Sequence, residues 1–302
     1  MNLSKTLLIG GTGFLGPIIL EKFPDIIAAG RSPLPNGLGN KFVHLPDLDS
    51  WSRLDAVDFD SVIFLIGSSD HKVLNSHPTL AIEMNVLPLK KMLAYLEKRP
   101  VKKLIALTTM LQYDSSKMQI PVDEGQPINP YVNNYVFSKV MAEQVTRMHR
   151  SKVPSIDVRI SNVYGPTHLL RPDIVPSLMW DVLSKKTASV WNKQPKRDFI
   201  FAEDAAEAIM ALCASDHVGP VNLGSGKATS VGRLTDIVSE LSGVKITEQG
   251  IPVSGHMEFV QDISLLQRIT GWKPKHTLEE GLSITYNRMK QHYEKFGLPK
   301  SH

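Results

Sequence analysis

The sequence contains a single cysteine, Cys213, so no disulfide can form within the chain, and we expect a reducing compartment, the cytoplasm. It lacks an uninterrupted apolar run of about 18 residues, so no membrane-spanning helix is expected. Blocks of five or more lysines and arginines are also missing, and a net charge of +4 fits an ordinary solvated surface. We therefore expect neither membrane nor nucleic acid as a partner, and no metal site.

Short apolar segments alternate with helical patterns in the first half of the chain. Alternation of this kind predicts parallel strands joined by right-handed crossovers, and hence an α/β fold with a Rossmann-like doubly wound parallel sheet. The expected strands cover residues 7–9, 26–29, 41–45, 61–66, 103–108 and 155–160, and the main helical patterns cover 77–97 and 133–149.

Prolines interrupt the pattern after Pro166 and the segments become shorter. We therefore expect a dinucleotide-binding domain over residues 1–165 and a smaller, mixed α/β substrate domain over 166–302. Segments near 198–225 are expected to return to the first domain. A chain of 302 residues is long enough for this arrangement.

The first apolar segment runs into a glycine-rich stretch. Glycines at these positions let the backbone approach a pyrophosphate, which the N–H groups of the following helix can then bind. Glycine turns also occur in ordinary strand–helix packing. The dinucleotide-binding interpretation is favoured because the glycines lie between an expected strand and an expected helix. The candidate cofactor residues are Gly10, Thr12, Gly13, Phe14, Leu15 and Gly16.

The end of the second expected strand carries no acidic residue. Folds that select NAD usually place Asp or Glu there to bind the ribose hydroxyls, whereas an arginine accommodates the 2′-phosphate of NADP. This chain has Arg31, and no acid occurs between Ile26 and Pro46. The sequence therefore favours NADP(H), with NAD(H) as the alternative and an exposed Arg31 as the plainer interpretation.

Two tyrosines precede a lysine by four residues, a spacing that places both side chains on one helix face. An ammonium beside a phenol stabilises the phenolate and lowers the tyrosine pKa, as general acid–base catalysis requires. Tyr113 and Lys117 fall in a polar loop, whereas Tyr135 and Lys139 begin a long helical pattern. We therefore select Tyr135 and Lys139, with Thr109 at the end of a strand as their partner on the reacting oxygen.

Further motifs stand in order along nearly the whole chain, and together they resemble the extended short-chain dehydrogenase/reductases, which include nucleotide-sugar epimerases, 4,6-dehydratases and 4-keto reductases. Each motif alone is weak, but seven at compatible separations are specific. They are Gly10-x-x-Gly13-x-x-Gly16, Thr109, Tyr135-x-x-x-Lys139, Arg159-x-x-Asn162-x-x-Gly165-Pro166, Arg197-Asp198 with Asp204, residues 221–226, and Gly271-x-x-Pro274.

The resemblance implies a role for each matching residue. Tyr135 acts as acid and base on a sugar hydroxyl or ketone, Lys139 holds the nicotinamide ribose, and Thr109 hydrogen-bonds the reacting oxygen. Asn162 and Arg197 contact the nucleotide diphosphate of the substrate, since an arginine fork suits phosphate. The resemblance also places Asp47 and Leu48 near the adenine, Gly67 at the cofactor and Asn85 in a structural position.

The sequence departs from the family at the residues after Thr109. The 4,6-dehydratases carry Asp-Glu there and this chain has Met110-Leu111, so we discount dehydration. The remaining interpretations are an NADPH-dependent 4-keto-sugar reductase, which the sequence favours, and a nucleotide-sugar 4-epimerase that retains NAD. A non-catalytic nucleotide-binding protein on the same fold is a third.

Relatives commonly form a dimer in which two helices of each subunit pack into a four-helix interface. We therefore expect a homodimer through the helices over 77–97 and 133–149. His71 and His77 could reach the substrate, although solvent exposure is the favoured interpretation for both. Arg171, Trp180 and Trp191 could line the substrate pocket, but large apolar side chains are more often core.

Overall fold

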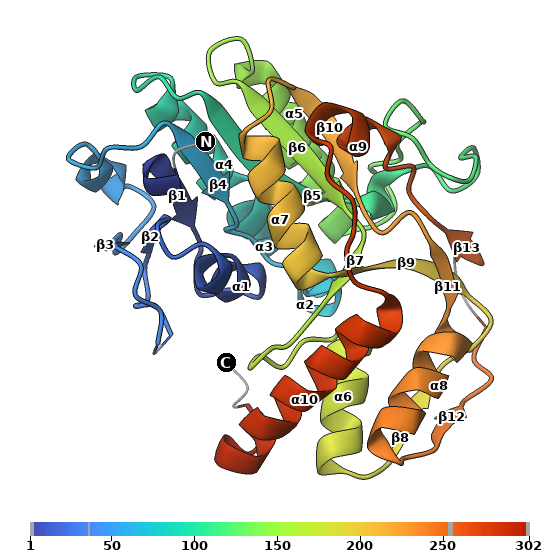
Figure 1. The fold of residues 1–302 in the computed structure, drawn as a ribbon. Helices are drawn as coiled ribbons and strands as arrows, with labels where there is room; N and C mark the ends of the chain where they lie inside the picture. Colours follow the sequence, from blue (N-terminus) through green and yellow to red (C-terminus); the bar gives the residue numbers. More distant parts are fainter. Residues whose placement is uncertain (1–2, 36, 253–255, 300–302) are drawn as a thin grey trace.

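A parallel sheet of seven strands forms the centre of the molecule (Figure 1) in a computed structural model that describes residues 3–35, 37–252 and 256–299. The strand order β3-β2-β1-β4-β5-β6-β10 reverses direction between β1 and β4, as in the expected doubly wound fold. The strands are β1 (Thr6–Ile9), β2 (Ile27–Gly30), β3 (Phe42–His44), β4 (Ser61–Phe64), β5 (Lys103–Thr109), β6 (Ser155–Ile160) and β10 (Gly219–Leu223).

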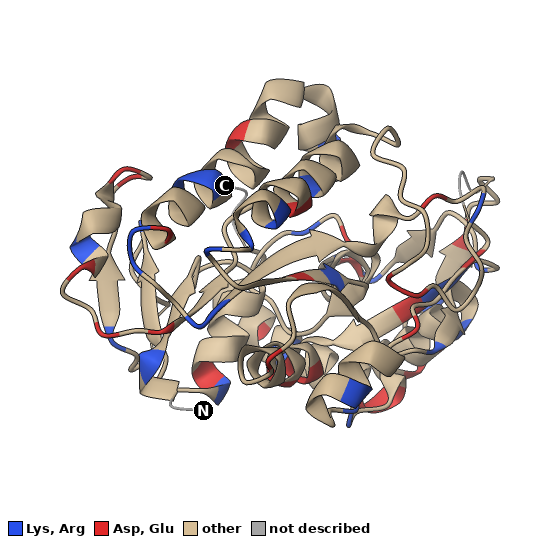
Figure 2. Cartoon of the chain, turned by 90° about the horizontal axis from the view of Figure 1, so that it is seen from above, with Lys and Arg blue, Asp and Glu red and all other residues tan. Residues whose placement is uncertain are grey.

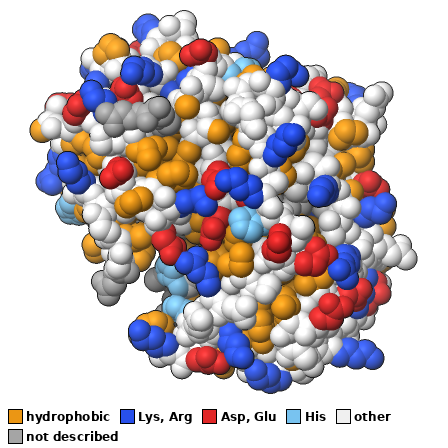
Figure 3. Space-filling model, in the orientation of Figure 1, with side chains coloured by type: hydrophobic (Ala, Val, Ile, Leu, Met, Phe, Trp, Pro, Cys, Tyr) orange, Lys and Arg blue, Asp and Glu red, His pale blue; other side chains and the backbone are white. Residues whose placement is uncertain are grey.

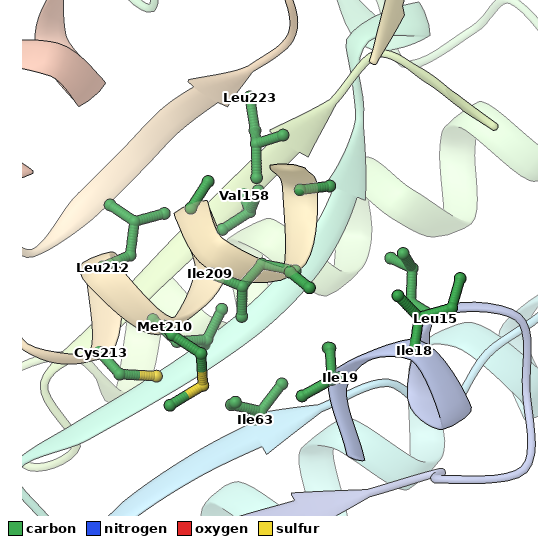
Figure 4. Packing of buried hydrophobic residues seen from close by; sticks show 14 of the residues in the cluster. Leu15, Ile18, Ile19, Ile63, Val158, Ile209, Met210, Leu212, Cys213 and Leu223 are labelled. Carbon is green, nitrogen blue, oxygen red and sulfur yellow. The ribbon is translucent and has the colours of Figure 1, made fainter. Parts of the chain in front are cut away.

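Helices cover both faces of this sheet, which is why most residues of its central strands are buried and many are apolar. On one face α1 (Leu15–Lys22) and α7 (Ala202–Cys213) pack against each other and on the sheet (Figure 4). On the other face lie α4 (Leu87–Leu96) and α5 (Asn134–His149). All four residues of β1 and of β4 are buried. A leucine-to-alanine change in such a core typically costs about 2–5 kcal/mol.

The helical pattern predicted over 77–97 is divided in the structure. It forms α3 (Pro78–Asn85) and α4, and a further short helix, α2 (His71–Ser76), precedes them. Pro88 lies in the first turn of α4, where its missing N–H is tolerated, but it cannot continue α3. The other expected helix, 133–149, agrees with α5 to within one residue.

Most segments from Asn162 onward form a second layer of structure, which lies below the sheet in Figure 1. Its helices are α6 (Ile174–Ser184), α8 (Val231–Ser242) and α10 (Leu278–Phe296), which share one apolar cluster. Its strands are β7 (Asn162–Tyr164), β8 (Ala188–Val190), β9 (Lys196–Phe201), β11 (Ala228–Ser230), β12 (Ile246–Glu248) and β13 (Glu258–Phe259).

The chain returns from this layer to the central sheet through α7, which covers the sheet, and β10, which pairs with β6. A last short helix, α9 (Ser264–Thr270), packs against α7 and β10. The domain division at residue 165 remains a prediction.

Charged residues of both signs are interspersed along the ribbon (Figure 2) and on the face of the molecule shown in Figure 3. Among the described residues, none of the helices combines the length and apolar character needed to cross a bilayer. Nor do these residues group three or more His, Cys, Asp or Glu side chains as a metal ion would require.

Candidate functional site

Two adjoining cavities lie at the carboxyl edge of the sheet, next to the point where the strand order reverses. One, about 330 Å³, is bounded by the glycine turn after β1, and we call it the glycine-turn cavity. The other, about 550 Å³, reaches from Thr109 into the second layer, and we call it the Thr109 cavity. The residues that line both are Ser69, Tyr135, Ile160, Val163, Arg171 and Pro172.

The glycine turn is shaped by close approach of the backbone. A Cβ on Gly16 would lie 2.5 Å from the Gly11 carbonyl oxygen, and a Cβ on Gly10 would lie 3.0 Å from the backbone of Leu65 and Ile66, directly after β4. Gly10 also has a φ of 90°, which only glycine adopts freely. No side chain caps the start of α1, so its first N–H groups are available to a phosphate. These residues fit a dinucleotide pyrophosphate.

Gly67 closes the other wall of the glycine-turn cavity. A Cβ at this position would lie 2.7 Å from Oδ1 of Asn85 and 3.4 Å from Nζ of Lys139. Asn85 Oδ1 accepts a hydrogen bond of 2.8 Å from the N–H of Ser68. Only glycine therefore lets the loop after β4 lie directly against Asn85, beside the lysine.

Tyr135 and Lys139 stand on the first turns of α5, which begins after the side chain of Asn133 caps it. Tyr135 is 5% exposed and lies between the two cavities, and Lys139 Nζ donates to the Leu107 carbonyl at 3.3 Å. Both side chains thus lie against the end of β5.

The pKa of Tyr135 is raised to about 12, because burial disfavours the phenolate more than a hydrogen bond with Thr109 favours it. Burial also lowers the pKa of Lys139 to about 8. The expectation that Lys139 brings the pKa of Tyr135 towards neutrality is therefore wrong for the protein by itself.

Thr109 ends β5 and lines the Thr109 cavity, and its hydroxyl accepts a hydrogen bond from the N–H of Leu111 at 3.2 Å. The competing Tyr113 is turned into the core, where its hydroxyl donates to Asn222 Oδ1 at 2.6 Å. Arg159 donates to the same hydroxyl at 3.1 Å. Tyr113 belongs to the lining of neither cavity, and Tyr135 lines both.

Asn162 and Arg197 both line the Thr109 cavity, on the neighbouring strands β7 and β9. Asn162 Nδ2 donates to the carbonyl of Asp198 at 3.1 Å. The Arg197 guanidinium donates to the carbonyl of Lys196, and burial lowers its pKa. Both can thus meet one substrate.

Four predicted cofactor residues lie outside the lining of both cavities. Arg31 is exposed directly after β2. Asp47 accepts hydrogen bonds from the backbone of Asp49 and from the Ser50 hydroxyl. Thr12 and Leu48 are the other two. The contacts of Asp47 belong to a local turn. That these four residues bind the adenosine part of the cofactor remains a prediction.

The structure adds residues that sequence reasoning placed elsewhere or left out. Solvent exposure, the favoured interpretation for both histidines, is wrong for His71, which is half-buried and lines the Thr109 cavity with Asp173. His77 is exposed as expected. Trp180 is core, whereas Trp191 lines the cavity. The position of His71 soon after a strand end was the available signal.

Arg171 connects the two layers at the boundary between the cavities. Its guanidinium forms an ion pair of 2.6 Å with Asp173, lies 4.4 Å from the centre of the Phe14 ring and donates to the Ser69 hydroxyl at 3.4 Å. A residue of the second layer thus packs directly on the glycine turn.

Comparisons with a family model and with known proteins point to the same protein family. A sequence model described as "NAD dependent epimerase/dehydratase family" matches residues 6–224. The chain is 28% identical to a Methanocaldococcus jannaschii protein named "Putative UDP-glucose 4-epimerase", with 94% of this chain and 98% of that protein covered. It is 24% identical to dTDP-6-deoxy-L-talose 4-dehydrogenase (NAD(P)(+)) of Kitasatospora kifunensis, covering 92% and 93%.

Among solved structures, UDP-glucose 4-epimerase of Thermotoga maritima with UDP-glucose superposes with a TM-score of 0.86. Its sequence is 20% identical, and the superposition covers 95% of this chain and 99% of that one. At this identity the likeness shows the shared fold.

Proposed function

Because the chain is an enzyme of the NAD dependent epimerase/dehydratase family, the extended short-chain dehydrogenase/reductases, we propose that it is a nucleotide-sugar 4-epimerase that retains NAD(H). The observation that carries the proposal is the position of Tyr135, which lines both cavities and lies beside Thr109. A group in this position can move a proton at an oxygen while a hydride moves at its carbon.

The residues that line the two cavities fit both ligands. The glycine turn and the start of α1 would hold the cofactor pyrophosphate, and Lys139 would bind the nicotinamide ribose. A bound nicotinamide supplies the hydride acceptor and, as a cation, favours the phenolate of Tyr135. Arg197 and Asn162 would bind the diphosphate of the substrate.

The proton chemistry follows from the geometry at the end of β5. Tyr135 would take the proton of the sugar 4-hydroxyl and return it to the ketone oxygen after the hydride has come back. Thr109 would hold that oxygen throughout. To receive hydride on its other face, the ketone must turn over within the Thr109 cavity, whose volume is about 550 Å³. Met110 and Leu111 supply no acid or base, so the proposal excludes 4,6-dehydration.

The naming of a relative 28% identical as a 4-epimerase supports this proposal over the sequence-based preference for a reductase. The first experiment is to denature the purified protein and identify released nicotinamide nucleotide by chromatography. The second is to incubate UDP- and dTDP-linked hexoses without added cofactor and separate the 4-epimers. We expect bound NAD(H) and conversion; an empty protein that converts none of them would contradict the proposal.

An NADPH-dependent 4-keto-sugar reductase is the second candidate. Arg31 and the lack of an acid between Ile26 and Pro46 favour it, as does similarity to a 4-dehydrogenase that uses NAD(P). Arg31→Ala distinguishes the two. For an epimerase we expect unchanged retention of NAD(H), whereas for a reductase NADPH affinity falls about tenfold and NADH affinity does not.

We also propose that two copies assemble through α3, α4 and α5. These helices carry several large apolar side chains that are exposed in the single chain. They are Met84 at 37%, Leu87 at 43%, Phe137 at 39% and Met148 at 74% exposure. Apolar groups gathered on neighbouring helices suit contact with a second copy.

A further inference from the structure

His71 packs its ring against Tyr135 while its two ring nitrogens form no hydrogen bond within the described residues. Its imidazole ring lies 4.0 Å from the Tyr135 ring, measured between centroids, with the planes inclined by 41°. The side chain is half-buried at the start of α2 and lines the Thr109 cavity. Within the described residues, neither ring nitrogen has a hydrogen-bond partner.

A half-buried imidazole beside a general acid–base usually has a partner for its nitrogens, from the protein, water or a ligand. Burial lowers the pKa of His71 despite the nearby carboxylates of Asp70 and Asp173. The ring is therefore neutral near pH 7, with one nitrogen that donates and one that accepts. Such a pair of groups matches a sugar hydroxyl, which also donates and accepts.

We propose that His71 is a substrate-contacting residue that binds a hydroxyl of the sugar on a carbon adjacent to the reacting one. This rests on the proposed function, in which the reacting oxygen lies between Tyr135 and Thr109. With the two rings in contact, the substituents of neighbouring carbons are the ones that come over the imidazole. His71 thereby selects sugars with a free hydroxyl at that carbon and holds the ring against Tyr135.

Two substitutions distinguish the contribution of the His71 nitrogens from that of the contact between its ring and Tyr135. His71→Phe keeps an aromatic ring against Tyr135 but removes both polar atoms, and His71→Gln keeps a donor and an acceptor without the ring. His77→Ala is the matched control, since His77 follows the same short helix and is exposed. All are measured as full-length, cofactor-loaded protein.

The readouts are kcat and KM with UDP-glucose or dTDP-glucose, and calorimetric affinity for the nucleotide sugar and for the nucleoside diphosphate without its sugar. For His71→Phe we expect kcat/KM to fall about 10- to 100-fold. The affinity gained from the sugar should disappear, while UDP or dTDP affinity, cofactor retention and Tm stay unchanged. His71→Gln should recover most of the loss, and His77→Ala should match the unsubstituted enzyme.

Unchanged kcat/KM in His71→Phe would overturn the proposal, as would equal loss of affinity for the nucleotide sugar and the free diphosphate. Failure of the proposed function looks different. In that case the unsubstituted protein converts no nucleotide sugar, or Tyr135→Phe keeps full turnover, and the role of His71 falls with it.

Discussion

Asn85 donates a hydrogen bond of 2.9 Å from its side-chain amide to the Ser138 hydroxyl, joining the end of α3 to the helix that carries Tyr135. Ser138 in turn donates to the carbonyl of Tyr135 at 2.7 Å. Because Asn85 also accepts from Ser68, one buried amide fixes the loop after β4 against the first turns of α5.

Asn85→Ala should therefore affect both stability and turnover. It leaves the N–H of Ser68 without its partner and removes the hydrogen bond that the Ser138 hydroxyl accepts, at a cost of about 1–3 kcal/mol in the free energy of unfolding. Urea unfolding measures this, and steady-state kinetics should show a lower kcat as Tyr135 and Gly67 lose their fixed separation.

Ser138→Ala provides the internal control. If the two side chains act through their shared bond, the double variant should lose less stability than the two single losses added together. Additive losses would show that Asn85 acts through some other contact.

The two Tyr-x-x-x-Lys pairs allow a matched test of the catalytic assignment. Tyr135→Phe should lower kcat by about 10²- to 10⁴-fold, the usual contribution of a general acid–base. Tyr113→Phe should leave kcat unchanged and lower stability by about 1 kcal/mol, because it removes buried hydrogen bonds to Asn222 and Arg159. Substrate turnover and thermal unfolding measure both variants, and the reverse pattern would exchange their roles.

The central sheet could be predicted from the sequence because its central strands are buried on both faces. Apolar segments such as residues 62–66 leave few alternatives, and all six predicted strands are present. The short strands of the second layer had no such signal. Strands of three residues, such as Ala188–Val190, depend on pairing partners far along the chain.

The candidate site was predictable where one chain segment contains the whole pattern. The glycine turn and the spacing of Tyr135 and Lys139 are of this kind, since helix geometry alone places the two side chains together. The contacts of Arg171 with Phe14 and of His71 with Tyr135 join segments more than 60 residues apart. Nothing in the local sequence specifies such contacts, which exist only after both layers have packed.

Burial of Lys139 predicts a pH dependence of stability. Its pKa is about 8 in the folded protein and 10.5 ordinarily, so between these values the unfolded chain binds more protons. The free energy of unfolding should then rise with pH across this window, by about 1–3 kcal/mol from this group. Below pH 8 both states are protonated and the contribution is constant.

Lys139→Met should remove that rise. Urea unfolding of both proteins at about pH 7 and about pH 10 gives the difference, with the exposed Lys90→Met as control. Parallel curves for the unsubstituted and Lys139→Met proteins would mean that Lys139 is solvated when folded. The raised pKa of Tyr135 acts above pH 10, where it should make stability fall again.

The assembly proposal is tested at Leu87, which is 43% exposed at the start of α4. In a dimer through these helices the leucine would be buried, and Leu87→Glu would place an unpaired charge in an apolar contact. We expect light scattering at micromolar concentration to give a dimer mass for the unsubstituted protein and a monomer mass for the variant. Val218→Glu, at a position equally exposed but away from these helices, should remain dimeric.

A monomer mass for the unsubstituted protein would rule out this assembly at that concentration. Dissociation by Val218→Glu but not by Leu87→Glu would move the interface to the edge of the sheet near β10.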